Sequence, residues 1–258
     1  SHLDISVIRG AGSEAENHNL LLRTWGGSTD LAHIHHDDDY LLPDFYRQHV
    51  IAHRNLPITI SASSRWIGNR EGIPTAFSQS PLEQFNTNER FAILKPDYLV
   101  KSLLVPVRNW IGEFSNVVIS KNVLAIMPTL PSINDPYWGM LDMSMYLTNC
   151  SHGKNMGYIR DHLSVYRKPS FNVEYMSPAT LKGKSIRFAW VVYAVQAWRH
   201  QLLNDEDFLA ALSNSLKSYS LSVPADAMTD KLVENITNSK GDLNAVANHI
   251  EEGWSALK

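Results

Sequence analysis

The sequence predicts an α/β fold over residues 1–175, followed by a helical region over residues 176–258. Short β-branched runs typical of strands alternate with helical patterns up to about residue 175. Beyond that point, apolar residues recur at helical spacing towards the end of the chain. The length of 258 residues suits one large domain with an appendage.

Capping and turn residues define the expected elements of the first region. Ser13 suits the N-cap of a helix that ends at Gly26, because its hydroxyl can accept a hydrogen bond from the first turn. Pro43 and Asp44 suit the first turn of a second helix, which runs to about His53. We expect strands at residues 4–9, 31–35, 58–63, 116–119 and 156–166. Further helices are expected at residues 96–110, with a break near Pro106, and at residues 121–125 and 141–147.

Charge and cysteine content exclude several classes of protein. The chain has 23 Lys and Arg against 26 Asp and Glu, a formal net charge of −3. That balance provides no broad basic surface, so we expect no nucleic acid partner. One cysteine, Cys150, excludes an intrachain disulfide and a Cys-based zinc knuckle. No stretch approaches the roughly 20 apolar residues that span a bilayer, so we expect at most peripheral membrane contact.

The strongest chemical signal is the run of histidines and carboxylates at residues 33–39 (HIHHDDD). Three successive carboxylates repel one another unless a cation lies among them. If the chain is extended here, Asp37 and Asp39 could point to the same face. Carboxylate oxygens are the natural ligands of Mg²⁺ and Mn²⁺. A solvated acidic turn is the alternative interpretation.

Residues 36–45 (HDDDYLLPDF) resemble the acidic motif of family 2 glycosyltransferases. The resemblance implies a GT-A-like fold, in which helices flank a mixed sheet. It also implies a strand that ends in an acidic group, which holds a divalent cation against the two phosphates of a nucleotide-sugar. Other segments resemble the family in the same order along residues 5–172: residues 15–19 (AENHN), 111–115 (IGEFS), 141–147 (LDMSMYL), 153–158 (GKNMGY) and 163–167 (LSVYR).

The resemblance implies an inverting sugar transfer to a saccharide or lipid-linked saccharide acceptor. The setting it implies is bacterial surface-polysaccharide synthesis in the cytoplasm, at most peripheral to the inner face of the membrane. A divalent cation, Mn²⁺ or Mg²⁺, would neutralise the leaving diphosphate. The residues implied are His36, Asp38 and Asp39 for the cation, and Asn17, Asp37, Asp38 and Arg167 for the donor.

Asp142 is the expected catalytic base. An inverting transfer needs a carboxylate that takes the proton of the acceptor hydroxyl as its oxygen attacks. Desolvation by Trp138, Met140 and Leu141 would raise the pKa of this carboxyl. The alternative for Asp142 is an ordinary interaction with the helix dipole, and Asp135 is the second choice of base.

The chain departs from the family pattern in two respects. The N-terminal nucleotide-binding half of the family has no counterpart here, so we expect the catalytic domain to be N-terminally incomplete. His36 stands where many members have the first Asp of the acidic motif, and Lys168 and Pro169 stand where many have a metal-binding histidine.

Two other functions stay open on the sequence. Residues 33–38 (HIHHDD) nearly fit the HxHxDH motif of metallo-β-lactamase-like hydrolases, whose histidines and carboxylates bind Zn²⁺. A non-catalytic saccharide-binding module is the third candidate. The aromatic-rich residues 186–203 could pack against the catalytic domain, form a homodimer face or dock on a membrane-bound partner.

Overall fold

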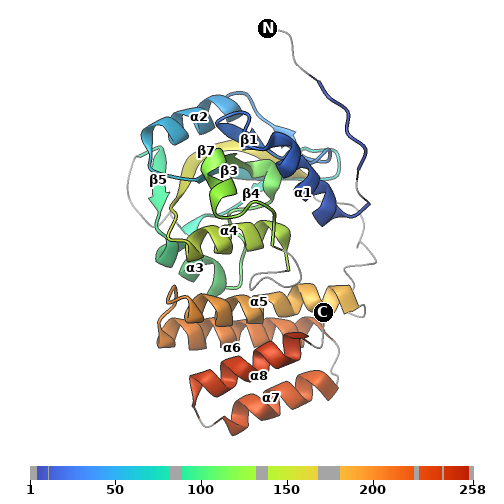
Figure 1. Ribbon diagram of the computed structural model, residues 1–258, viewed down its shortest axis with the longest axis vertical. Helices are drawn as coiled ribbons and strands as arrows, with labels where there is room; N and C mark the ends of the chain where they lie inside the picture. Colours follow the sequence, from blue (N-terminus) through green and yellow to red (C-terminus); the bar gives the residue numbers. More distant parts are fainter. Residues whose placement is uncertain are drawn as a thin grey trace.

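A computed structural model describes residues 5–10, 12–81, 89–131, 139–167, 181–223, 227–239 and 241–255. The first part of the molecule is a mixed sheet flanked by helices, and the last part is built from helices (Figure 1). The predicted α/β class, with its mixed sheet and C-terminal helical region, is therefore confirmed.

Two long strands form the centre of the sheet. β3 (Ile60–Gly68) and β7 (Met156–Arg167) lie parallel to each other, while the other strand pairs are antiparallel. The strand order is β1-β6-β3-β7-β2, with β4 beside β3 and β5 beside β7. The short strands are β1 (Leu31–His33), β2 (Tyr40–Leu41), β4 (Pro74–Phe77), β5 (Phe91–Leu94) and β6 (Val117–Ser120).

Helices cover both faces of this sheet. One face packs on α3 (Pro96–Leu104) and α4 (Leu141–Ser151) in the larger apolar cluster, and the other packs on α2 (Phe45–Asn55) in a smaller one. α1 (Glu14–Trp25) begins where the Ser13 hydroxyl accepts the Glu16 N–H, as the sequence predicts.

The C-terminal helices extend the same core. They lie in successive layers beyond α3 and α4 (Figure 1), and α5 forms the first layer. Phe188 and Val192 of α5 are buried in the cluster that contains the α3 and α4 side chains. The larger apolar cluster is therefore continuous from the sheet through α3 and α4 into the helical region. The four helices are α5 (Leu181–Arg199), α6 (Asp205–Ser222), α7 (Ala227–Asn238) and α8 (Leu243–Ser255).

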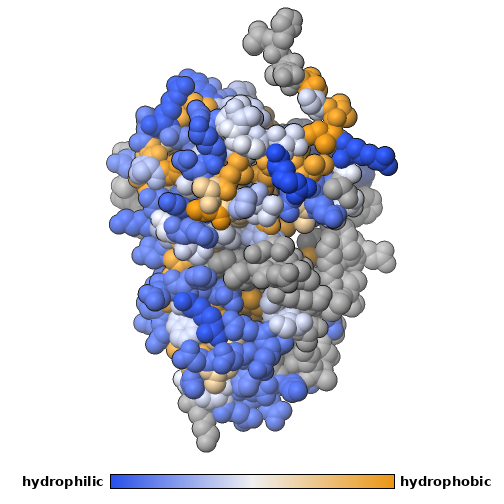
Figure 2. All heavy atoms as spheres, viewed as in Figure 1, coloured by the Kyte–Doolittle hydropathy of each residue, from blue (hydrophilic) through white to orange (hydrophobic). Residues whose placement is uncertain are grey.

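The prediction of a strand at residues 4–9 is wrong for the described residues 5–9, which do not form a strand. The segment stands off the body (Figure 1) with Ile5 and Val7 77% and 96% exposed, and its apolar side chains are conspicuous in Figure 2. β-branched residues favour a strand only where a neighbouring strand pairs with the backbone, and no described strand does so here. The helix expected over residues 96–110, with a break near Pro106, ends at Leu104, just before that proline.

No helix in the described ranges combines the length and apolarity needed to cross a bilayer.

Buried histidines lie between α2 and the sheet. The Ser61 hydroxyl of β3 lies 2.6 Å from His49 Nδ1 and 3.0 Å from His53 Nε2, both on α2. The His49 side chain is fully buried. Burial lowers the pKa of His49 well below its usual value and lowers the pKa of His53 as well.

We expect His49 to make stability fall in acid. Its pKa is lower in the folded state, so its contribution is complete above about pH 6.5, the unfolded value, and is lost as pH falls below it. Between pH 7.5 and pH 5 the loss from this residue is at most about 2 kcal/mol, the limit set by the unfolded pKa of about 6.5. In urea unfolding, His49→Phe should show a correspondingly shallower pH dependence than the wild type.

His152 provides the control, because it is exposed at the C-cap of α4. His152→Phe should keep the wild-type pH dependence of unfolding. An identical pH dependence in wild type and His49→Phe would show that His49 is not held neutral by the fold.

Candidate functional site

The carboxylate run forms a turn between two edge strands. β1 ends at His33 and β2 begins at Tyr40, and the chain turns at residues 37–38. Because this segment is not extended, the alternation that would place Asp37 and Asp39 on one face does not hold. The turn instead gathers His36, Asp38 and Asp39, whose ligand atoms all lie within 4.8 Å of one another.

The chemistry of this group, which we call the acidic cluster, suits a divalent cation. Asp39 is buried, His36 is half-buried and Asp38 is exposed, so a bound ion would still be open to a ligand on one side. Two carboxylates and one imidazole are a donor set that Mn²⁺ accepts readily and that Mg²⁺ accepts through its oxygens. The residues present therefore fit the cation that the sequence resemblance implies.

Arg167, at the end of β7, fixes the shape of the turn. Its Nε donates to the backbone carbonyl of Asp38 at 2.7 Å, and its backbone N–H donates to Asp39 Oδ1 at 3.1 Å. Its guanidinium also lies over the Tyr40 ring, 5.5 Å from the centroid. One residue of the central strand therefore holds two of the three members of the acidic cluster.

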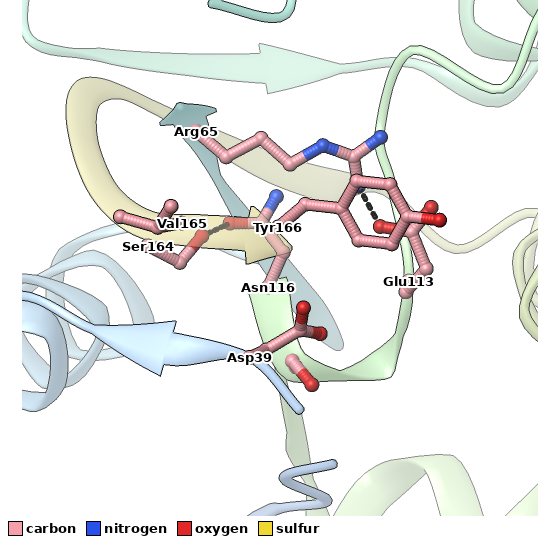
Figure 3. A pocket seen from close by; sticks show the side chains of 8 residues that line it. Asp39, Arg65, Glu113, Asn116, Ser164, Val165 and Tyr166 are labelled. Carbon is pink, nitrogen blue, oxygen red and sulfur yellow. Dashed lines mark hydrogen bonds and ion pairs between the residues drawn. The ribbon is translucent and has the colours of Figure 1, made fainter. Parts of the chain in front are cut away.

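A narrow pocket adjoins the acidic cluster (Figure 3). The side chains leave no space between them for a sphere the size of a water molecule, so the pocket is too tight to hold a nucleotide-sugar unless they move. The side chains around it are mostly polar or charged, which is unusual so close to the centre of a sheet. The lining residues are Asp39, Arg65, Glu113, Ser115, Asn116, Ser164, Val165 and Tyr166.

The buried Asn116 amide organises the wall of the pocket. Its Oδ1 accepts the hydroxyls of Ser63 and Ser164 at 2.8 and 2.7 Å. Its Nδ2 donates to the backbone carbonyls of Ser63 and Ile111 at 2.6 and 2.8 Å. All four hydrogen bonds that the amide can make are formed, and they join β3, β7 and the loop before β6.

Arg65 and Glu113 form an ion pair at the back of the pocket. The Arg65 side chain is 8% exposed and the Glu113 side chain is 32% exposed. The guanidinium also lies 5.5 Å from the Tyr166 ring centroid. Gly112, at φ +108°, leaves space for the Arg65 guanidinium, because a Cβ at position 112 would lie 1.5 Å from Arg65 Nη1.

Asp142 lies in the first turn of α4, beside this ion pair. Its carboxylate accepts the Asn109 amide at 2.6 Å and the Met143 backbone N–H at 2.7 Å. Burial, reinforced by the charge of Glu113, raises the pKa of Asp142 to about 7, against the opposing effects of the Met143 N–H and Arg65. A carboxyl with this pKa can take up and release a proton near neutral pH.

The helical region fixes the start of α4. Tyr193 of α5 accepts the Met140 backbone N–H at 2.8 Å, and its hydroxyl lies 3.1 Å from Ser144 Oγ. Gly139 permits this contact, because a Cβ there would lie 2.5 Å from the Tyr193 oxygen. The position of Asp142 therefore depends on a residue from the C-terminal helices.

The structure brings some of the predicted site residues together and leaves others apart. His36, Asp38, Asp39 and Arg167 meet at the acidic turn, and Asp142 lies by the Arg65–Glu113 pair. Asn17 and Asp37 are exposed and are not members of the acidic cluster. The residues that fall outside the described part of the chain are Asp135, Trp138, Lys168 and Pro169.

The sequence prediction gave no role to His18 and Glu113, which the structure places at the site. It treated Arg65 as a surface arginine that could pair with diphosphate oxygens. His18 lies 3.2 Å from His36, while Arg65 and Glu113 line the pocket. One feature of the sequence could have identified Arg65 as a buried, paired residue. It is the single charged residue of an otherwise uncharged strand, and a buried charge requires a partner. Glu113 follows the glycine of a segment that resembles the family, but its partner is 48 residues away. No pattern in the sequence predicts the contact between His18 and His36.

No protein-family model matches this chain, and no curated protein sequence matches it. The function proposed below rests on the site residues and on the motif resemblance.

Gly112→Ala should displace Arg65 from Glu113 and lower the free energy of unfolding by more than about 1 kcal/mol. Urea unfolding measures the loss. Gly153→Ala is the matched control, since Gly153 also has a positive φ, +68°, but a Cβ there would meet nothing within 4 Å. Equal losses in the two variants would mean that the contact with Arg65 adds nothing to backbone strain.

Proposed function

We propose that this protein is an inverting glycosyltransferase that moves a sugar from a nucleotide-sugar to a saccharide or lipid-linked saccharide. The supporting observation is that two chemically different groups share one site: the acidic cluster and a carboxyl of pKa about 7. Glu113 interacts electrostatically with Asp39 and His36 on one side and with Asp142 on the other. Glu113 therefore links the two groups electrostatically, which supports their action on one substrate.

The acidic cluster would serve the leaving group. His36, Asp38 and Asp39 would hold the divalent cation, Mn²⁺ or Mg²⁺, which supplies Lewis-acid neutralisation of the donor diphosphate. Arg167 keeps the backbone of the turn in the shape that gathers these ligands. The donor diphosphate would approach the acidic cluster from its exposed side, where Asp38 lies.

Asp142 would serve the acceptor. As the acceptor oxygen forms its bond to C1 of the sugar, the bond from C1 to the phosphate oxygen breaks and its electron pair leaves with the diphosphate. The proton of the acceptor hydroxyl passes to the Asp142 carboxylate. Asn109 orients that carboxylate, and burial beside Glu113 raises its proton affinity.

The remaining parts of the proposal come from the sequence resemblance. They are a lipid-linked or free saccharide acceptor, a role in bacterial surface-polysaccharide synthesis, and action on the cytoplasmic side, with at most peripheral membrane contact. Arg167 lies at the cluster as a donor contact would. Asn17 and Asp37, which are exposed, would contact the donor only outside the pocket.

The hydrolase alternative gains no support from the geometry. A zinc site of the HxHxDH kind needs His33 as a ligand, but both of its ring nitrogens are engaged. Nε2 donates to the Ser115 carbonyl at 3.1 Å and Nδ1 accepts from the Tyr46 hydroxyl at 3.1 Å. His35 is exposed, and neither histidine belongs to the acidic cluster.

Binding of the donor is the first test. We expect one nucleotide class among UDP-, GDP-, dTDP- and CMP-sugars to raise the thermal unfolding midpoint in the presence of Mn²⁺ and not in its absence. A ligand at a hundredfold excess over its Kd stabilises the fold by about 2.7 kcal/mol. Asp38→Ala should abolish this stabilisation, because the exposed carboxylate would contribute a cation ligand.

Asp230→Ala, at an exposed position on α7, is the control and should respond to the donor as the wild type does. Stabilisation by Zn²⁺ alone would favour the hydrolase. No response to any nucleotide-sugar would favour the saccharide-binding module.

The rate of transfer should follow the ionisation of Asp142. Because only the deprotonated carboxylate can accept the hydroxyl proton, the rate should rise as pH increases through about 7 and then level off. Asp142→Asn should lower the rate by about 10²–10⁴-fold while the donor still binds. Steady-state kinetics with the donor identified above measure both effects.

Asp97→Asn is a matched control, since Asp97 is also a first-turn aspartate but is exposed on α3. It should keep the wild-type rate. An unchanged rate and pH profile in Asp142→Asn would place the base elsewhere.

A further inference from the structure

A second histidine stands behind the acidic cluster. His18 Nε2 lies 3.2 Å from His36 Nε2, and His18 Nδ1 lies 2.7 Å from the backbone carbonyl oxygen of Glu14. The His18 side chain is buried, and its ring packs on Phe114 with 4.7 Å between centroids. His18 is therefore held at one end by its own helix and at its face by an aromatic ring.

The partners of His18 decide where its proton lies. A carbonyl oxygen can only accept, so His18 Nδ1 must carry the hydrogen. A neutral ring with its hydrogen on Nδ1 has a lone pair on Nε2, so His18 Nε2 can only accept. The hydrogen between the two rings must therefore belong to His36 Nε2.

The same reasoning fixes the tautomer of His36. With its hydrogen on Nε2, the neutral imidazole keeps its lone pair on Nδ1. His36 is also held through its backbone, whose N–H donates to Ser115 Oγ at 3.0 Å. The ring therefore has one nitrogen committed to His18 and one available as a ligand.

We propose that His18 is a positioning residue that fixes the His36 tautomer and ring orientation so that Nδ1 serves as a ligand of the cation. The proposal rests on the cation site of the proposed function. Histidines that bind metals commonly donate their other N–H to a fixed acceptor, which orients the ring and increases its basicity. Here a second histidine, itself fixed by Glu14, is that acceptor.

Two His18 variants separate this role from simple packing. His18→Leu fills the space against Phe114 but offers no acceptor to His36. His18→Gln places an amide oxygen where Nε2 stood and can accept the same hydrogen bond. We expect Mn²⁺ affinity to fall about 10–100-fold in His18→Leu and to be largely rescued in His18→Gln.

The measurement is Mn²⁺ binding to the full chain, followed by the electron paramagnetic resonance signal of the free ion. Circular dichroism and thermal unfolding should show that each variant is folded. His152→Leu changes an exposed histidine on α4 and should bind Mn²⁺ as the wild type does. Equal affinity in wild type and His18→Leu, or equal loss in His18→Leu and His18→Gln, would overturn the proposal.

The tautomer supplies a readout that needs neither metal nor substrate. Long-range ¹H–¹⁵N NMR correlations of the His36 ring should place the hydrogen on Nε2 in the wild type and on both nitrogens, as a mixture, in His18→Leu. A hydrogen on Nδ1 in the metal-free wild type would overturn the proposal directly.

These experiments distinguish a failure of the proposed function from a failure of the proposed role of His18. Normal Mn²⁺ binding without transfer from any nucleotide-sugar would remove the glycosyltransferase and leave the role of His18 in place. A wild type that binds no Mn²⁺ would remove the cation and, with it, the role of His18.

Discussion

The site depends on the hydrogen-bonded side chain of Asn116. Its amide is buried and makes every hydrogen bond available to it, with partners on β3, β7 and the loop before β6. A buried amide with an unmet donor or acceptor would lose about 1–3 kcal/mol. These hydrogen bonds join the three segments and make one wall of the pocket polar.

Charge then divides the site into two parts. Glu113, the ion-pair partner of Arg65, interacts electrostatically with both the acidic cluster and Asp142. Removing Glu113 would leave the buried Arg65 guanidinium without its ion-pair partner. The pair also explains how two carboxylates, Glu113 and Asp142, can lie so close: Arg65 lowers the pKa of each while burial raises it.

The C-terminal helices contribute to the site without lining the pocket. Through the Tyr193 hydroxyl, α5 holds the first turn of α4, which carries Asp142. The same helix buries Phe188 and Val192 in the core shared with α3 and α4. The helical region is thus part of the framework that sets the position of the candidate base, and a change in α5 could alter chemistry at a distance.

The sequence by itself determined the fold class, the main helices and most of the strands, because caps, prolines and apolar spacing act over a few neighbouring residues. It also singled out His36, Asp38, Asp39, Arg167 and Asp142, which carry local motifs. Tertiary structure alone decided that the chain turns at residues 37–38, leaving Asp37 outside the cluster, and that residues 5–9 pair with no described strand. It alone brought Glu113 to Arg65 and His18 to His36, since these contacts join residues 48 and 18 positions apart. Local sequence patterns cannot specify such pairs, because they form only when separate elements pack against one another.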